Sequence, residues 1–101
     1  MKVNRALTSL DITGSEILAA GAEALAAALQ VNSTLTSLDC SWCAISGNGA
    51  QALAEALQVN RGLVSLEISG NETGDDGAQA LAQALEINTT LTSLFACQND
   101  I

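Results

Sequence analysis

The sequence repeats itself every 28 residues, and this period constrains the fold more than any other feature. Copies of one pattern begin at Val3, Val31, Val59 and Ile87, with no insertion between them. The units span residues 3–30, 31–58 and 59–86, and a partial unit covers residues 87–101. A fixed period of this length is typical of stacked repeat proteins, in which each unit packs on its neighbours. We therefore expect residues 1–101 to form a single repeat domain, either whole or as a fragment of a longer array.

The first half of each unit predicts a short strand with one buried face. Its pattern is leucine, two residues, leucine, one residue and an apolar residue, as in Leu35, Leu38 and Cys40. The last two apolar positions alternate with a polar one, which matches the period of a strand. We expect strands near residues 9–12, 37–40, 65–68 and 93–96.

The second half of each unit predicts an alanine-rich helix, near residues 19–30, 47–58 and 75–86. A leucine pair four residues apart, such as Leu53 and Leu57, lies on one helical face, and alanine is the strongest helix former. Asp75 and Asp76 are expected to cap the third helix and to complement its dipole. An asparagine follows each expected helix: Asn32, Asn60 and Asn88. We expect these residues to adopt the left-handed conformation that ends many helices.

These halves together resemble ribonuclease-inhibitor-type leucine-rich repeats, which also occur in NOD-like receptors. The resemblance covers residues 3–101 and includes an Asn/Cys position after each strand, filled by Ser15, Cys43, Asn71 and Asn99. It implies an α/β fold, a short leucine-rich-repeat solenoid that forms a right-handed βα superhelix. The parallel sheet would line its concave face and the helices its convex face. Thr73 departs from the pattern, because the other units have isoleucine there.

Charge and cysteine content narrow the partners and the compartment. The net charge of -8 disfavours nucleic acid and anionic membranes and mildly favours a basic protein partner. The alternative is that this charge only keeps the array soluble. No run reaches the ~18 apolar residues of a membrane helix, and the N-terminal alanine-rich run belongs to the repeat, not to a signal peptide. With three cysteines we expect a cytoplasmic protein, or an effector secreted without a classical signal peptide.

The outward strand positions are candidate partner-binding residues. They comprise one row of Asp11, Asp39, Glu67 and Phe95, and beside it Ser37 and Ser65. Neighbouring strands lie ~4.8 Å apart, so three acids would line up on the concave face, where like charges repel and nothing in the expected fold requires them. One interpretation is a groove for a cationic or hydroxyl-rich partner surface. The other is a solvated face without a ligand.

Trp42 is a further candidate, because it stands where two other units have Gly14 and Gly70. We expect its side chain to be partly exposed. It would then either anchor a partner beside the groove, together with Phe95, or cover an adjacent turn or an end contact.

Cys40 and Cys43 have the C-x-x-C spacing of redox pairs and of half a zinc site. The repeat register instead places Cys40 at an inward strand position and Cys43 at the Asn/Cys position, which favours buried structural thiols. The chain has no histidine, and no nucleophile accompanies the acids. We therefore expect no catalytic residue, no metal site and no cofactor.

These features favour a non-enzymatic protein-binding module that acts through the concave strand face and its adjoining turns. The alternative is a structural or oligomerising segment of a larger receptor or scaffold, without a ligand of its own. Neither end of the array has an evident cap, so we also expect free sheet edges and a homodimer formed through the terminal repeats.

Overall fold

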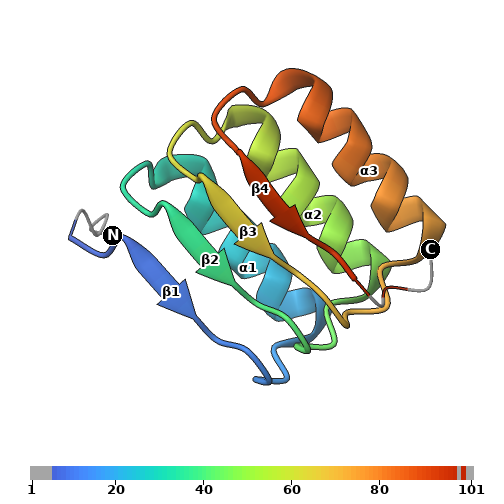
Figure 1. Cartoon of the computed structure of the whole chain (residues 1–101). Helices are drawn as coiled ribbons and strands as arrows, with labels where there is room; N and C mark the ends of the chain where they lie inside the picture. The colour runs from blue at the N-terminus through green and yellow to red at the C-terminus, as the bar shows by residue number, and fades with distance from the viewer. Residues whose placement is uncertain (1–5, 98, 100–101) are drawn as a thin grey trace.

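The computed structural model describes residues 6–97 and residue 99, which form a row of strand–helix units (Figure 1). The elements are β1 (Ser9–Asp11), α1 (Leu18–Val31), β2 (Ser37–Asp39), α2 (Ser46–Val59), β3 (Ser65–Glu67), α3 (Gly74–Ile87) and β4 (Ser93–Phe95). Each element recurs at the same position of the next unit, and every expected strand and helix is confirmed to within one residue at each end. Ile101, the last position of the pattern, lies outside the described residues.

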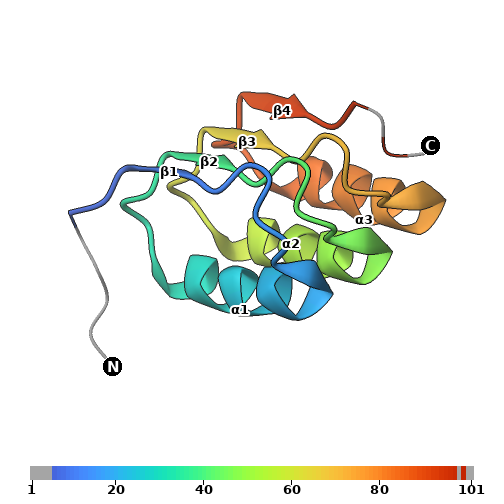
Figure 2. The same ribbon diagram turned by 90° about the horizontal axis from the view of Figure 1, so that it is seen from below.

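The four strands form one parallel sheet in chain order, β1-β2-β3-β4. Leu38 pairs with Leu10 on one side and with Leu66 on the other, and Leu66 pairs in turn with Leu94. The three helices lie side by side in a second layer behind the sheet (Figure 2). The predicted α/β solenoid, with its leucines stacked in a single column, is thereby confirmed.

The core lies between the two layers and is most complete in the middle units. Leu38 and Leu66 from the sheet and Leu53 and Leu57 from α2 are 0–1% exposed. Fully burying such a side chain contributes roughly 1.5–3 kcal/mol. Alanine residues such as Ala54 fill the contacts between helices, where a larger side chain would hold the helices apart. The stability of the described array therefore depends mainly on its central units.

One ladder of buried asparagine side chains joins the turns that follow the strands. The Asn71 Oδ1 accepts the backbone N–H of Cys43 at 2.8 Å, and its Nδ2 donates to the carbonyls of Cys40 and Ile68, both at 2.9 Å. Asn99 repeats the arrangement one unit later, with its Oδ1 accepting the Asn71 N–H at 2.7 Å. Buried backbone N–H and C=O groups need hydrogen-bond partners. The ladder provides them for turn residues that lie outside the strands and helices.

A second ladder joins the loops that follow the helices. The Asn60 Nδ2 donates to the carbonyls of Leu29 and Asn32, both at 2.8 Å, and its Oδ1 accepts the Leu63 N–H at 2.8 Å. Asn88 makes the equivalent bonds one unit later. The predicted left-handed conformation is wrong, because the three asparagines are extended, with ψ of 125°, 133° and 128°. Asparagine is needed there for its side-chain amide, not for its backbone.

The start of α3 is also only partly as predicted. Asp75 and Asp76 lie in its first turn, where their charge complements the helix dipole. The capping residue, however, is Thr73, and its side chain makes no capping hydrogen bond. Thr73 is 2% exposed, and its Oγ1 has no hydrogen-bond partner among the described residues.

None of the helices in residues 6–97 has the length and apolarity that a membrane span requires.

Candidate partner-binding surface

The register of the sheet assembles the predicted row on the face turned away from the helices. Asp11 pairs with Asp39, Asp39 with Glu67, and Glu67 with Phe95. We call the three carboxylates the acidic row. Phe95, which is 51% exposed, closes the row at its C-terminal side. The half-buried serines Ser37 and Ser65 pair with each other one position earlier, so every predicted site residue on the strands lies on one surface.

The carboxylates of the acidic row affect one another. The negative charge of Asp39 raises the pKa of Glu67 above its usual value of 4.5, with smaller contributions from desolvation, a hydrogen bond to Asp39 and the charge of Asp11. In contrast, the pKa of Asp11 is lowered by hydrogen bonds from the hydroxyl and the backbone N–H of Thr13. A positive group placed on this row would relieve the repulsion.

The expectation that nothing in the fold requires the acids is wrong for two of them, which have a structural role. The Asp11 Oδ1 accepts the Thr13 backbone N–H at 3.0 Å and its hydroxyl at 2.6 Å, and the Asp39 Oδ1 accepts the Ser41 N–H at 3.0 Å. Such bonds stabilise the turn that ends each strand. In the third unit, the N–H two residues after Glu67 donates to the Ser41 Oγ instead. Glu67 is therefore the member of the row that its turn does not require.

The Trp42 side chain is half exposed and also packs against a neighbouring turn. Its side chain is 54% exposed, as predicted, yet its ring also lies against the next turn. A Cβ built on Gly70 would come within 2.3 Å of the indole, so only glycine leaves room for the ring. The backbone of Trp42 has φ of +57°, where Gly14 and Gly70 have +79° and +70°. A bulky residue is rare in this left-handed region, and the N–H of Trp42 is held by the Ser69 carbonyl at 2.8 Å.

A hollow of about 260 Å³ lies beside the indole, between successive strand-to-helix turns. It is lined by Glu16, Trp42, Ala44, Ser46, Gly70, Asn71 and Glu72. Sequence reasoning missed this hollow, because its residues come from three units and no single motif contains them. An alignment of the units would have indicated the hollow. Glu16, Ala44 and Glu72 occupy one repeat position, and only the middle unit has a small residue there.

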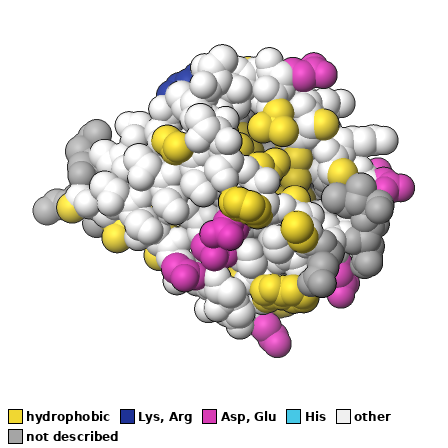
Figure 3. Space-filling view, viewed as in Figure 1, with side chains coloured by type: hydrophobic (Ala, Val, Ile, Leu, Met, Phe, Trp, Pro, Cys, Tyr) yellow, Lys and Arg dark blue, Asp and Glu magenta, His cyan; other side chains and the backbone are white. Residues whose placement is uncertain are grey.

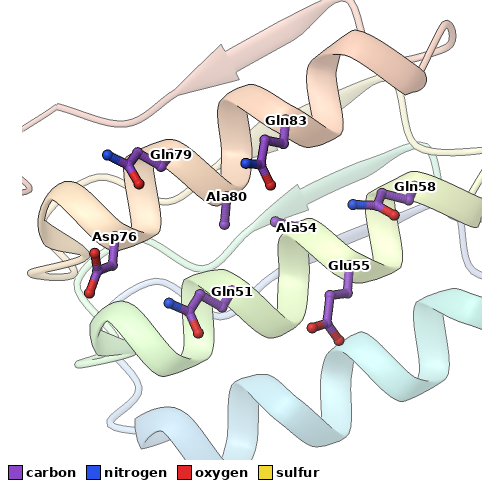
Figure 4. Close-up of a pocket in the computed structure, with 8 residues that line it drawn as sticks. All are labelled: Gln51, Ala54, Glu55, Gln58, Asp76, Gln79, Ala80 and Gln83. Atoms are coloured by element: carbon purple, nitrogen blue, oxygen red, sulfur yellow. The ribbon is translucent and has the colours of Figure 1, made fainter.

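The convex face has two grooves of similar construction. The groove between α2 and α3, of about 320 Å³, has an alanine floor and walls of glutamine and acidic side chains (Figure 4). The groove between α1 and α2, of about 400 Å³, is built in the same way. Both follow from packing alanine-rich helices side by side, so neither singles out a ligand.

The cysteines have the structural character that the register predicted for Cys40 and Cys43, because both are buried. Burial is the main cause that raises the pKa of Cys40 to about 12. The Cys43 Sγ donates to the Ile12 carbonyl at 3.1 Å, and Cys97 is exposed. Within the described residues, no group of three His, Cys, Asp or Glu side chains is placed to hold a metal ion.

The fold is a solenoid of strand–helix repeats. Its strands are parallel and in chain order, a helix connects each strand to the next, and asparagine ladders join the units. Residues 3–26, 31–54 and 59–82 each match the family model described as Leucine Rich repeat. The chain belongs to the leucine-rich repeat family. No curated protein matches it in sequence.

Solved structures extend this likeness. The structure titled leiomodin-1 actin-binding site 2 is similar over 97% of this chain, with a TM-score of 0.89 and 26% sequence identity. The match covers 58% of that structure, so this chain spans less than two thirds of its length. A tropomodulin C-terminal domain from Caenorhabditis elegans is similar over 93% of this chain and 75% of its own, with a TM-score of 0.64. At 13% identity, that second likeness concerns the fold alone.

Proposed function

We propose that this leucine-rich repeat chain is a non-enzymatic protein-binding module whose concave sheet face and adjoining turns contact the partner. The observation that carries the proposal is the indole of Trp42, half exposed although its ring is fixed against Gly70. Tryptophan is enriched among the residues that dominate binding energies, especially where its position is fixed before binding. Phe95, also half exposed, provides a second aromatic on the outward face of the sheet.

The acidic row supports a partner with basic side chains. Its carboxylates lie in consecutive strands. Glu67 accepts no hydrogen bond from its own turn, so no such bond offsets the repulsion between Glu67 and Asp39. Complementary charge would relieve that repulsion and speed the encounter between the two proteins. A purely structural repeat segment, the alternative function, would account for the packing of the Trp42 ring on Gly70 but not for its exposed face or for the charge of Glu67.

Actin is the first partner to test, because the structure that resembles this chain at 26% identity carries an actin-binding site in its title. We further propose a ribonuclease-inhibitor-type repeat and a cytoplasmic location, which fits three unpaired thiols. The net charge of -8 supports neither nucleic acid nor an anionic membrane as a partner.

The binding face is tested with monomeric actin and four forms of the chain, measured by microscale thermophoresis. Trp42→Gly restores the residue of the equivalent turns, so it removes the indole without new strain. Glu67→Lys reverses a charge of the acidic row, and Glu86→Lys is the matched control, because Glu86 is exposed at the end of α3.

The first two variants should bind actin about tenfold more weakly, as expected for loss of a central contact, whereas Glu86→Lys should bind as wild type does. Equal binding by all four forms would contradict the proposed face. If actin binds no form, actin is excluded, and a partner captured from cells should crosslink to the β2–β4 face.

A further inference from the structure

The hollow beside Trp42 exists because one unit differs from its neighbours. Glu16, Ala44 and Glu72 occupy the same position of three successive units. The methyl group of Ala44 leaves a gap between two carboxylate-bearing residues, and Trp42, Gly70, Ser46 and Asn71 complete the lining. The hollow therefore combines one aromatic face with two acids.

Hydrogen bonds between the turns fix the walls of this hollow. The Leu18 N–H donates to the Cys43 carbonyl at 3.1 Å, and the Ser46 N–H donates to the Asn71 carbonyl at 2.9 Å. Bonds of this kind link each turn to the next. The backbone segments that carry the two glutamates and Trp42 are therefore already in place before a ligand binds. Such preorganisation lowers the entropic cost of binding a ligand.

The charge around the hollow has one sign. In the part of the chain that the structure describes, Arg61 is the one basic residue. It lies in the helix-to-strand loop at the opposite end of the sheet, where its Nη1 donates to the carbonyls of Gln58 and Asn60, both at 3.1 Å. Figure 3 shows acidic side chains around exposed hydrophobic ones on the sheet side, with basic atoms at one edge of the view. No described residue of the chain itself therefore neutralises Glu16 and Glu72.

We infer that this hollow binds an arginine side chain of the protein partner, an inference that rests on the proposed function. A planar guanidinium stacks on an indole face and presents several N–H donors at its edge. Its edge would donate to Glu16 and Glu72 while its plane lies on Trp42. A lysine ammonium is a point charge that cannot stack in this way, so arginine should be preferred to lysine.

The experiment uses the peptide acetyl-Gly-Arg-Gly-amide as the probe. Trp42 is the one tryptophan of the chain, which has no tyrosine, so intrinsic fluorescence and the indole N–H resonance both report on the hollow. The arginine peptide should shift both signals, a lysine peptide should bind more weakly, and a citrulline peptide, which is neutral, should leave the signals unchanged.

Paired variants separate the hollow from the overall charge of the chain. Glu16→Gln combined with Glu72→Gln removes two negative charges at the hollow. Glu23→Gln combined with Glu86→Gln removes two negative charges from exposed helix positions. The first pair should weaken arginine-peptide binding about tenfold, because charge-assisted bonds are lost, whereas the second pair should change it less than about twofold.

Equal losses from both pairs would show that only long-range charge attracts the peptide, and would overturn the inference. So would an indole N–H resonance that the arginine peptide leaves in place. If the peptide fails to bind while Trp42→Gly still weakens protein binding, the proposed function stands and the hollow is not an arginine site. If the peptide binds but no substitution on the sheet face affects a protein partner, the proposed function fails instead.

Discussion

Thr73 offers the sharpest test of how the repeat register determines stability. The equivalent residues are Ile17 and Ile45, so the register provides an apolar site at this position. Thr73 is 2% exposed and its Oγ1 has no hydrogen-bond partner among the described residues. In the unfolded chain, water satisfies the same hydroxyl. Folding therefore removes a hydrogen bond and returns none, which costs about 1–3 kcal/mol.

Thr73→Val keeps the shape of the side chain and replaces the hydroxyl by a methyl group. The desolvation cost disappears, and the buried methyl adds roughly 0.8 kcal/mol. Part of this gain is lost if the neighbours of a closely packed site must shift to accept a methyl group, which is larger than a hydroxyl. We expect a net gain of about 1–2 kcal/mol in the free energy of unfolding. For a domain of this size, each kcal/mol raises Tm by roughly 4–8 °C.

Urea unfolding followed by far-ultraviolet circular dichroism gives the free energy of unfolding directly. The matched control is Thr89→Val, which makes the same chemical change at an exposed position after α3 and should alter stability by less than about 0.5 kcal/mol. A Thr73→Val variant no more stable than the wild type would refute the reasoning, since either the hydroxyl is satisfied or the pocket rejects a methyl group.

Four further outcomes follow from the structure. Asn71→Ala leaves several buried backbone groups without partners and should cost at least about 3 kcal/mol of unfolding free energy in the same urea assay. In the native state a thiol reagent should label Cys97 alone, with all three cysteines labelled only after unfolding; rapid native labelling of the other two would contradict their burial. Asp39 raises the pKa of Glu67, so this pair destabilises the folded state as pH rises through the titration of Glu67. Asp39→Asn should lower that pKa in a carboxyl NMR titration, and an unchanged value would exclude the coupling. The 101-residue chain should self-associate through its terminal repeats, and light scattering from a concentrated solution that gives the monomer mass would remove that expectation.

The strands, the helices and their order follow from the sequence, because the 28-residue period fixes which residues share a face. The acidic row follows for the same reason, since register alone aligns Asp11, Asp39 and Glu67. The role of Asn60 could not be predicted in this way. Its amide bonds to the Leu29 carbonyl 31 residues earlier, so its function exists only once two units are stacked. A local reading of the helix end therefore gave the wrong backbone conformation.

The turn bonds of the acids and the hollow at Trp42 show the same limit. A strand pattern says which way Asp39 points but not that its carboxylate accepts the Ser41 N–H. The hollow depends on a small residue, Ala44, lying between two larger ones from neighbouring units. That difference is visible only when the units are aligned, and its depth is visible only in three dimensions.

The asparagine ladders also bear on how such an array can grow. The Asn71 amide bridges units by bonding backbone groups, and Asn99 makes the same kind of bonds one unit later. Because main-chain atoms are the same in every residue, each junction accepts any neighbour that has the right length and one correctly placed amide. Duplicating a whole unit in the gene would therefore insert a compatible layer without redesigning the old ones, whereas gain or loss of a single residue would break two junctions at once.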